Sequence, residues 1–372
     1  MWGRLQSAGL GAWRAEERLQ TKSLHHIEAQ IPCLSVGDRG NEGKGGYRIA
    51  ISQRGGQGLR HADRFPQMKT LRSASVLVLL VVTHLFAQAA LQAQGTIVAW
   101  GENDKGQMDV PPSLTGVIAI AARGKHSMAL RADGTVVAWG ENDKGQSDVP
   151  ADLRGVVGIA AGSRHSVVLR GDGTVVAWGD NEKGEATVPA GLNGVTAVAA
   201  GNYHNVALRK DGTVVAWGAN EKGQTVIPEG LSDVIAVAAG LEHTVVLRKD
   251  GTVLAWGGNF WGQTTVPTGL TGVTRISAGY YNTMALKSDG TVVAWGSNRF
   301  HESTLPVGLA GVVRISAGWH HGAAVKNDGT VVAWGANTNV KNQVVGQATV
   351  PAGLSGVTEV VASGLFTMAL KK

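Results

Sequence analysis

Tryptophan recurs every 39 residues from Gly95 to the end of the chain, and this repeat constrains the fold more than any other feature. The seven tryptophans are Trp100, Trp139, Trp178, Trp217, Trp256, Trp295 and Trp334. Around each one the chain repeats GTVVAWG-xNxxGQ-xxVP-xxLxGVxxIAAG-xxH-xxALRxD, and the seventh unit carries additional residues around 338–345. This self-similarity predicts an array of identical units that bury their core against one another.

Each unit contains four short apolar runs typical of β-strands, for example residues 195–201, 205–210, 213–218 and 225–228. Asp211-Gly212 joins the second run to the third, and Asp-Gly favours a two-residue type I′ hairpin turn. One such sheet cannot bury both of its faces, so neighbouring sheets must cover each other. Radial stacking of four-stranded sheets makes a β-propeller. We therefore predict an all-β, seven-bladed propeller over residues 94–372.

The repeat starts out of phase, which predicts how the ring closes. The chain enters at a third strand, 96–101, and ends on a second strand, 367–372. We expect the last blade to combine residues 357–372 with residues 95–111, so that the N- and C-terminal strands pair within one blade. The 53 glycines and only 5% aromatic residues agree with a turn-rich β protein and disfavour a helical bundle.

Residues 68–93 have the three parts of a secretory signal peptide. Lys69 and Arg72 form a positive region, residues 76–86 an apolar core, and residues 87–89 a small-x-small cleavage pattern. The apolar core is shorter than the roughly 20 residues that a membrane-spanning helix needs. The segment predicts export to the periplasm or the cell exterior, with membrane attachment only if it stays uncleaved.

The basic charge and the single cysteine belong to the leading segment. Residues 1–94 hold 12 of the 34 basic and 6 of the 28 acidic residues, so residues 95–372 hold 22 of each. A neutral, cysteine-free body argues against nucleic-acid binding and against disulfides or Cys-based zinc sites. Residues 1–67 show no periodicity. We predict that they are unstructured and that translation begins at Met68; a basic tail before an uncleaved signal anchor is the alternative.

Histidines recur at one blade position, where they could ring the axis and hold a metal: His126, His165, His204, His243 and His321. However, Asn282 and Phe366 occupy that position in two blades, and no carboxylate recurs with ligand spacing. We interpret the histidines as hydrogen-bonding framework residues that close the loop between the first and second strands. The repeated tryptophans are interpreted as packing between blades.

The remaining motifs do not indicate an enzyme. Polar loops such as 102–107 and 180–185 lack the spaced ligands of a calcium loop and are interpreted as solvated turns. The sequence contains no nucleophile elbow, phosphate-binding loop or HExxH motif. We predict no catalytic residue, no metal and no cofactor.

The aromatic residues outside the framework gather on one predicted face. In an antiparallel blade, the loops that join strands 1–2 and 3–4 emerge together. All the extra aromatics lie in or beside these loops: Tyr203, Phe260, Trp261, Tyr280, Tyr281, Phe300, Trp319 and Phe366. Six of them occupy three consecutive blades, and we call these six the aromatic arc: Phe260, Trp261, Tyr280, Tyr281, Phe300 and Trp319.

The equivalent loops of the other blades are charged, as at 102–105 and 180–183. If the six rings of the aromatic arc are half exposed, they offer roughly 450–750 Å². That area approaches the roughly 800 Å² that each partner buries in a standard interface. We therefore predict that the aromatic arc, together with Tyr203 and His320, binds a partner.

The pattern AGxxH-[ST]-xAL-xxDG-xVxAWG-xNxxGQ resembles the RCC1-type repeat across residues 95–372. The 39-residue period and the TVP segment are similar in style to the secreted β-lactamase-inhibitory propellers of that superfamily. The resemblance implies a propeller, while the functions it covers range from GTPase exchange factors and ubiquitin-ligase modules to secreted inhibitors. It also implies that Trp261, Tyr281 and Trp319 grip the target. Asn282, His301 and the 338–345 insertion depart from the pattern and leave the target open.

Together these features predict a secreted, monomeric, non-enzymatic propeller that binds another protein, with a hydrolase such as a β-lactamase as a candidate. A glycan-binding propeller is one alternative, although a lectin would be expected to repeat its site in every blade. An RCC1-like GTPase regulator that promotes guanine-nucleotide exchange is another, and it needs an access to cytoplasm or nucleus that a signal peptide denies.

Overall fold

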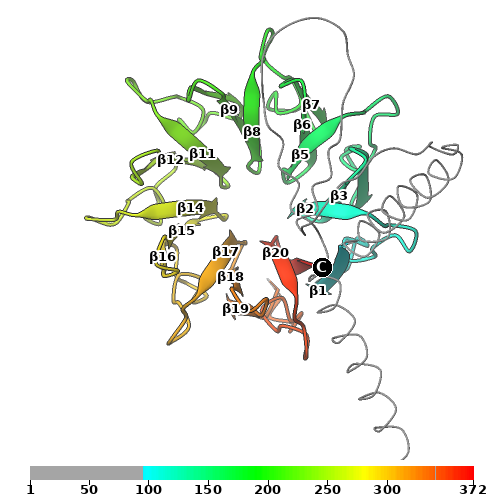
Figure 1. The fold of residues 1–372 in the computed structure, drawn as a ribbon, viewed down its shortest axis with the longest axis vertical. Helices are drawn as coiled ribbons and strands as arrows, with labels where there is room; N and C mark the ends of the chain where they lie inside the picture. Colours follow the sequence, from blue (N-terminus) through cyan, green and yellow to red (C-terminus); the bar gives the residue numbers. More distant parts are fainter. Residues whose placement is uncertain (1–94, 340) are drawn as a thin grey trace, which may run out of the picture. The chain divides into compact units, whose positions relative to one another are not determined.

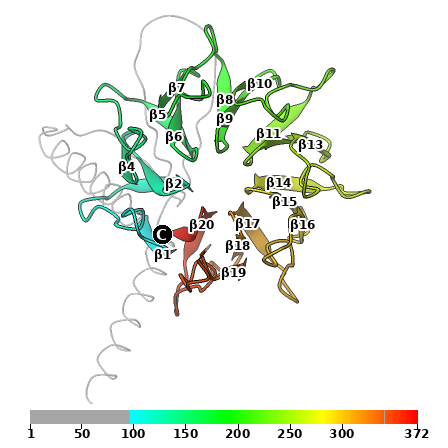
Figure 2. The ribbon, with the colours of Figure 1, turned by 180° about the vertical axis from the view of Figure 1, so that it is seen from behind.

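The computed structural model describes residues 95–339 and 341–372. The predicted signal peptide at 68–93 and residues 1–67 lie outside the described residues. The described part contains 21 β-strands and no helix, so no helix there is suited to cross a membrane. Seven three-stranded sheets surround a common axis as blades (Figures 1 and 2). The predicted all-β, seven-bladed propeller is confirmed.

The innermost strands face the axis: β2 Val117–Arg123, β5 Val156–Ala161, β8 Val195–Ala200, β11 Val234–Ala239, β14 Val273–Ala278, β17 Val312–Ala317 and β20 Val357–Ala362. The middle strands are β3 His126–Arg131, β6 His165–Arg170, β9 His204–Arg209, β12 His243–Arg248, β15 Asn282–Lys287, β18 His321–Lys326 and β21 Phe366–Lys371. The outer strands are β1 Thr96–Gly101, β4 Val136–Gly140, β7 Val175–Gly179, β10 Val214–Gly218, β13 Val253–Gly257, β16 Val292–Gly296 and β19 Val331–Gly335.

The ring closes as predicted. Blade 7 has the strand order β1-β21-β20, and β1 pairs antiparallel with β21 from Thr96 opposite Lys371 to Gly101 opposite Phe366. Blades 1 to 6 follow the chain order, from β2–β4 in blade 1 to β17–β19 in blade 6. The first and last strands of the described chain therefore complete one blade together.

Each blade has three paired strands rather than the predicted four. The run at 225–228 forms no ladder because its backbone donors are satisfied locally. Thr225 N–H donates to the Asn220 side chain, and Val226 N–H donates to the Gly223 carbonyl. Pro228 removes a further donor.

The Asp-Gly turn also differs from the predicted type I′ turn. Asp133 keeps a negative φ, and only Gly134 takes a positive φ, of 78°. Arg131 N–H donates to the Thr135 carbonyl, and Gly134 N–H donates to the Arg131 carbonyl. This is a three-residue loop, a type I turn followed by a left-handed glycine. The Asp133 carboxylate accepts from the Thr135 N–H and hydroxyl, which stabilises the longer loop.

The core lies between blades, around the middle strands. From the first to the fifth residue, every middle strand is fully buried. In one cluster, Val167 and Leu169 of blade 2 pack with Val195 and Trp217 of blade 3. Burying a side chain of this size stabilises a fold by about 1.5–3 kcal/mol. Because each blade covers its neighbour, the strands are apolar on both faces, as the unbroken apolar runs predict.

Candidate functional site

The framework histidines link one blade to the next, as shown by His126. Its Nε2 lies 3.0 Å from the Ser166 hydroxyl of the following blade. That hydroxyl donates to the Gln146 carbonyl, so it accepts from the Nε2–H of a neutral imidazole. The other four histidines make the same link to Asn205, Thr244, Thr283 and Thr367.

The predicted framework role is thus confirmed, but its partners lie in the next blade rather than within one loop. Among residues 95–339 and 341–372, no group of His, Cys, Asp or Glu is arranged to hold a metal. The framework tryptophans also join blades, since Trp139 Nε1 donates to the Gln107 carbonyl of the preceding blade. Phe366, at the histidine position of blade 7, is completely buried and belongs to the core rather than to the surface.

The loops after the outer strands share one backbone scaffold. In six of the seven loops the asparagine accepts a backbone N–H five residues later, as Asn103 does from Met108; in blade 6 the insertion lengthens this to eleven, from Ala348 to Asn337. The glutamine four residues after the asparagine accepts the backbone N–H of the residue two positions before it. Lys105 donates to Gln107 in this way, and Trp261 donates to Gln263. Two adjacent positions of the loop differ most clearly in character from blade to blade. They are acid–Lys in blades 7, 1, 2 and 3, Phe260-Trp261 in blade 4 and Arg299-Phe300 in blade 5.

In the charged sector, each lysine reaches the acid of the next blade. Lys105 Nζ lies 3.1 Å from Asp143, Lys144 contacts Glu182, and Lys183 Nζ lies 2.7 Å from Glu221. These hydrogen bonds raise the pKa of all three lysines. The next acid position is occupied by Phe260, so this ladder of ion pairs ends where the aromatic arc begins.

The rings of the aromatic arc form one continuous chain together with His320. Phe260 meets Trp261 edge-on at 5.0 Å between centroids, and Trp261 lies 6.4 Å from Tyr281. Tyr281 lies 6.3 Å from Tyr280, which stacks on Trp319 at 4.9 Å. His320 completes the chain, 4.7 Å from Trp319 and 4.0 Å from Phe300. The structure therefore brings together seven of the eight predicted site residues.

Tyr203 is the eighth predicted residue, and it makes no ring contact with the chain of rings in the described structure. It is 40% exposed and belongs to blade 3, next to the sector that holds the aromatic arc. Phe260 is 87% exposed, whereas the other five rings of the aromatic arc are half-buried by their contacts with one another. The exposed apolar area is therefore smaller than the area expected for half-exposed rings. Stacking has exchanged exposed area for a fixed arrangement of the rings.

Arg123 supports this arrangement from across the axis, and the sequence reasoning missed it. Its Nε donates to Asn202 Oδ1 at 2.9 Å, and its two Nη atoms donate to the carbonyls of Ala239 and Gly279 at 3.0 and 3.3 Å. The guanidinium also lies 5.7 Å from the centroid of the Tyr280 ring. Burial lowers the pKa of Arg123 to about 10, which leaves it charged at neutral pH.

A departure from the repeat was the available signal for Arg123, because the five following blades carry glycine at this position. At Gly162, an added Cβ would lie 2.1 Å from the ring of His165. Blade 1 accommodates the arginine by turning Gly124 into the left-handed region, with φ of 59°. The side chain can then reach from β2 toward β14, which faces it across the ring (Figure 1).

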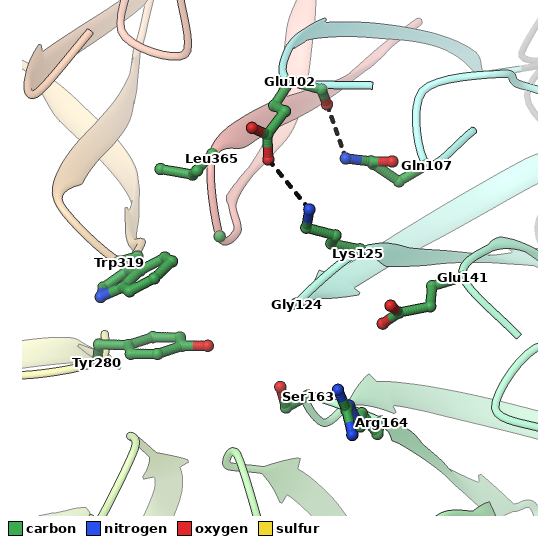
Figure 3. Close-up of a pocket in the computed structure, with 11 residues that line it drawn as sticks. Glu102, Gln107, Gly124, Lys125, Glu141, Ser163, Arg164, Tyr280, Trp319 and Leu365 are labelled. Atoms are coloured by element: carbon green, nitrogen blue, oxygen red, sulfur yellow. Dashed lines mark hydrogen bonds and ion pairs between the residues drawn. The ribbon is translucent and has the colours of Figure 1, made fainter. Parts of the chain in front are cut away.

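A pocket of about 170 Å³ opens beside the aromatic arc on the same face (Figure 3). Tyr280 and Trp319 form one wall, and blades 7, 1 and 2 supply a polar wall that includes Glu102, Lys125 and Arg164. Lys125 Nζ lies 3.4 Å from Glu102. The pocket is therefore lined by charged side chains on one side and by rings of the aromatic arc on the other. At the rim, Asn339 of the insertion lies 3.4 Å from Glu102.

The sequence matches the model of the Regulator of chromosome condensation (RCC1) repeat in six segments, 117–146, 156–185, 195–224, 234–263, 273–302 and 312–339. The chain is an RCC1-repeat protein. No curated protein matches its sequence. The likeness to the secreted β-lactamase-inhibitory propellers remains one of repeat length and TVP segment.

Solved structures show the same fold at low sequence identity. Prp20p from Saccharomyces cerevisiae, described with its binding to Gsp1p and histones, is 20% identical with a TM-score of 0.62, over 74% of this chain and 91% of that one. Human WBSCR16 is 19% identical with a TM-score of 0.60, over 75% and 99%. The ectodomain of the Physcomitrella patens receptor kinase CR4 is 21% identical with a TM-score of 0.55, over 70% of each chain. These likenesses concern the fold alone.

Proposed function

We propose that this RCC1-repeat protein is a secreted, non-enzymatic propeller that binds another protein through the aromatic arc, His320 and Tyr203. The observation that carries the proposal is the continuous chain of rings on loops that share one pattern of backbone hydrogen bonds. Rings held by mutual stacking lose little freedom on binding, which favours affinity. Trp and Tyr at the centre of a patch fenced by polar loops match the composition of binding hot spots.

The partner class we propose is an extracellular or periplasmic enzyme that the propeller inhibits, with a hydrolase such as a β-lactamase as the first candidate. The signal-like segment at 68–93 supports export, and the CR4 ectodomain is a relative in fold that belongs to a receptor's extracellular part. The 39-residue period and the TVP segment support an inhibitor. An arc of rings with a charged sector beside it suits a folded protein surface better than a repeated small ligand.

A pull-down tests this function. The full chain is immobilised and exposed to extracellular and periplasmic proteins that include β-lactamases, beside a variant with Trp261→Ala, Tyr281→Ala and Trp319→Ala. A matched variant changes three exposed apolar residues outside the aromatic arc, Ile118→Ala, Val157→Ala and Ile235→Ala. Circular dichroism confirms that both variants are folded. We expect a protein that is retained by the chain and the matched variant and lost by the arc variant.

Three results would count against the proposal. Equal retention by all three proteins, or by none, would mean that the aromatic arc does not bind proteins under these conditions. Accelerated nucleotide exchange on a Ran-type GTPase would instead favour the GTPase-regulator alternative, which shares its fold with Prp20p. Capture of an enzyme whose turnover is unchanged would support binding by the aromatic arc but refute inhibition.

A further inference from the structure

The pocket at the axis arises from the residue that stands two positions before each framework histidine or its equivalent. Around the ring these residues are Gly124, Ser163, Asn202, Leu241, Tyr280, Trp319 and Gly364. The three smallest are neighbours in space, in blades 7, 1 and 2, and the bulky ones face them. This asymmetry leaves the space that Figure 3 shows between Tyr280 and the polar wall. A chain of seven identical repeats would not contain it.

Two of the three small residues, the glycines, also differ from the other blades in their backbone bonding. In most blades the N–H at this position donates to a carbonyl of the next blade, as Tyr280 does to Gly318 at 3.2 Å and Trp319 does to Ser363 at 3.0 Å. Within the described residues, the N–H groups of Gly124 and Gly364 make no such backbone bond. Both glycines line the pocket.

Two acids and two cations line the pocket, and the acids share their lysines with other carboxylates. Glu102 lies 3.4 Å from Lys125, which also contacts Asp104, and Glu141 lies 3.7 Å from Lys105, which lies closer to Asp143. Arg164 is exposed at the pocket wall and has no ion pair among residues 95–339 and 341–372. Its guanidinium offers several donors in a planar fork that matches a carboxylate.

Two hydroxyl groups add to this donor set. The Tyr280 hydroxyl points into the pocket, and Ser163 stands beside Arg164 (Figure 3). Arg123, one residue before Gly124, adds a positive charge whose three bonds go to neutral acceptors. A site with free N–H and O–H donors and an unpaired guanidinium favours an acceptor that carries negative charge.

We propose that this axial pocket binds the carboxylate of an aspartate or glutamate side chain that the partner protein presents. The proposal rests on the function proposed above and adds the partner's chemistry, an acidic side chain at the centre of the contact beside the apolar surface that meets the rings. Arg164 would hold the carboxylate, with the N–H groups of Gly124 and Gly364 as further donors.

The repeat supplies variants that the backbone already accepts. Arg164→Glu copies Glu242, and Ser163→Leu copies Leu241, each at the equivalent position of blade 4. The first reverses the charge of the proposed ligand group, and the second fills the pocket. Arg154→Glu makes the same change of charge at an exposed arginine outside the pocket and serves as the matched control.

The test measures binding of small probes to the full chain by saturation-transfer NMR. The probes are N-acetyl-glutamate amide, N-acetyl-glutamine amide and N-acetyl-lysine amide. We expect the acidic probe to bind with a Kd of about 1–20 mM and to weaken at least about tenfold in Arg164→Glu and Ser163→Leu. Arg154→Glu should bind it like the unchanged chain. The neutral and basic probes should bind at least about tenfold more weakly than the acidic one.

Equal binding of the glutamine probe, preference for the lysine probe, absence of acidic-probe binding, or an unchanged Kd in Arg164→Glu would each overturn the proposal. The probes need no partner protein, so this failure is separable from failure of the proposed function. Partner capture without acidic-probe binding would refute the pocket alone. Acidic-probe binding without partner capture would refute the protein-binding arc alone.

Discussion

Acid should unfold this propeller in a pH range set by the five framework histidines. Burial lowers the pKa of His126, His204, His243 and His321 to about 3 and that of His165 to about 4. The cause is the loss of hydration in the closed space between blades. In each of the five, Nε2 bonds to the next blade and the buried Nδ1 has no partner among the described residues. A proton added to Nδ1 would therefore create a buried cation without an acceptor.

The change in the free energy of unfolding with pH follows from the linkage between protonation and folding. An unfolded histidine has a pKa of about 6.5. Below that pH the unfolded chain binds protons at these histidines, whereas the folded chain does not, so the free energy of unfolding falls. Each histidine then lowers the free energy of unfolding by about 1.4 kcal/mol per pH unit. The five together lower it by about 7 kcal/mol per pH unit. Between pH 7 and pH 5 the loss is about 9 kcal/mol, which is comparable with the whole stability of a typical domain.

The assay is urea unfolding followed by tryptophan fluorescence at several pH values between 7 and 5. His243→Asn copies Asn282 and should reduce the slope of unfolding free energy against pH by about 1.4 kcal/mol per pH unit, the contribution of one buried histidine. His301→Asn is the matched control, because His301 is exposed and its φ of 63° suits asparagine. A slope below about 2 kcal/mol per pH unit between pH 6 and 5, or an unchanged slope in His243→Asn, would refute the reasoning.

Three further predictions concern the frame of the site. Arg123→Gly restores the residue of the repeat but removes three hydrogen bonds donated by a charged group. The entropy gained because a long side chain is no longer held in place offsets part of this cost. We expect the free energy of unfolding in urea to fall by about 1–3 kcal/mol. Deleting residues 95–111 removes β1 and leaves β21 paired with β20 alone, which opens the ring at blade 7, so calorimetry should show no cooperative transition. Lys144→Ala breaks a solvent-screened ion pair and should shift the midpoint of thermal unfolding by less than about 2 °C.

Much of the fold could be predicted because every repeat carries the same pattern of apolar runs and turn residues. The spacing of Trp100 and its successors fixed the number of blades, and the phase of residues 95–101 fixed the closing strand. The prediction of a fourth strand was wrong because side chains such as that of Asn220 accept the backbone N–H groups that a strand would use for pairing. The turn type was wrong because Asp133 holds a longer loop through its carboxylate.

The site was partly predictable for a different reason. Residues that break a repeat stand out, so the aromatic arc could be read from Phe260 to Trp319. Its mutual stacking, and therefore its reduced exposure, depends on side-chain directions that the sequence does not state. The contact of Arg123 with Tyr280 joins positions far apart in the chain. The pocket depends on Gly124 and Gly364, which become neighbours only when the ring closes.

Hydrogen–deuterium exchange on the chain with and without a captured partner shows whether the aromatic face binds a protein. We expect slower exchange in the complex at the loops that carry the aromatic arc, 258–263, 279–282, 298–303 and 318–321. The Asp-Gly turns on the other face, such as 132–134, should exchange at the same rate in both samples. Protection confined to the Asp-Gly turns, with the arc loops unchanged, would mean that the partner binds the other face.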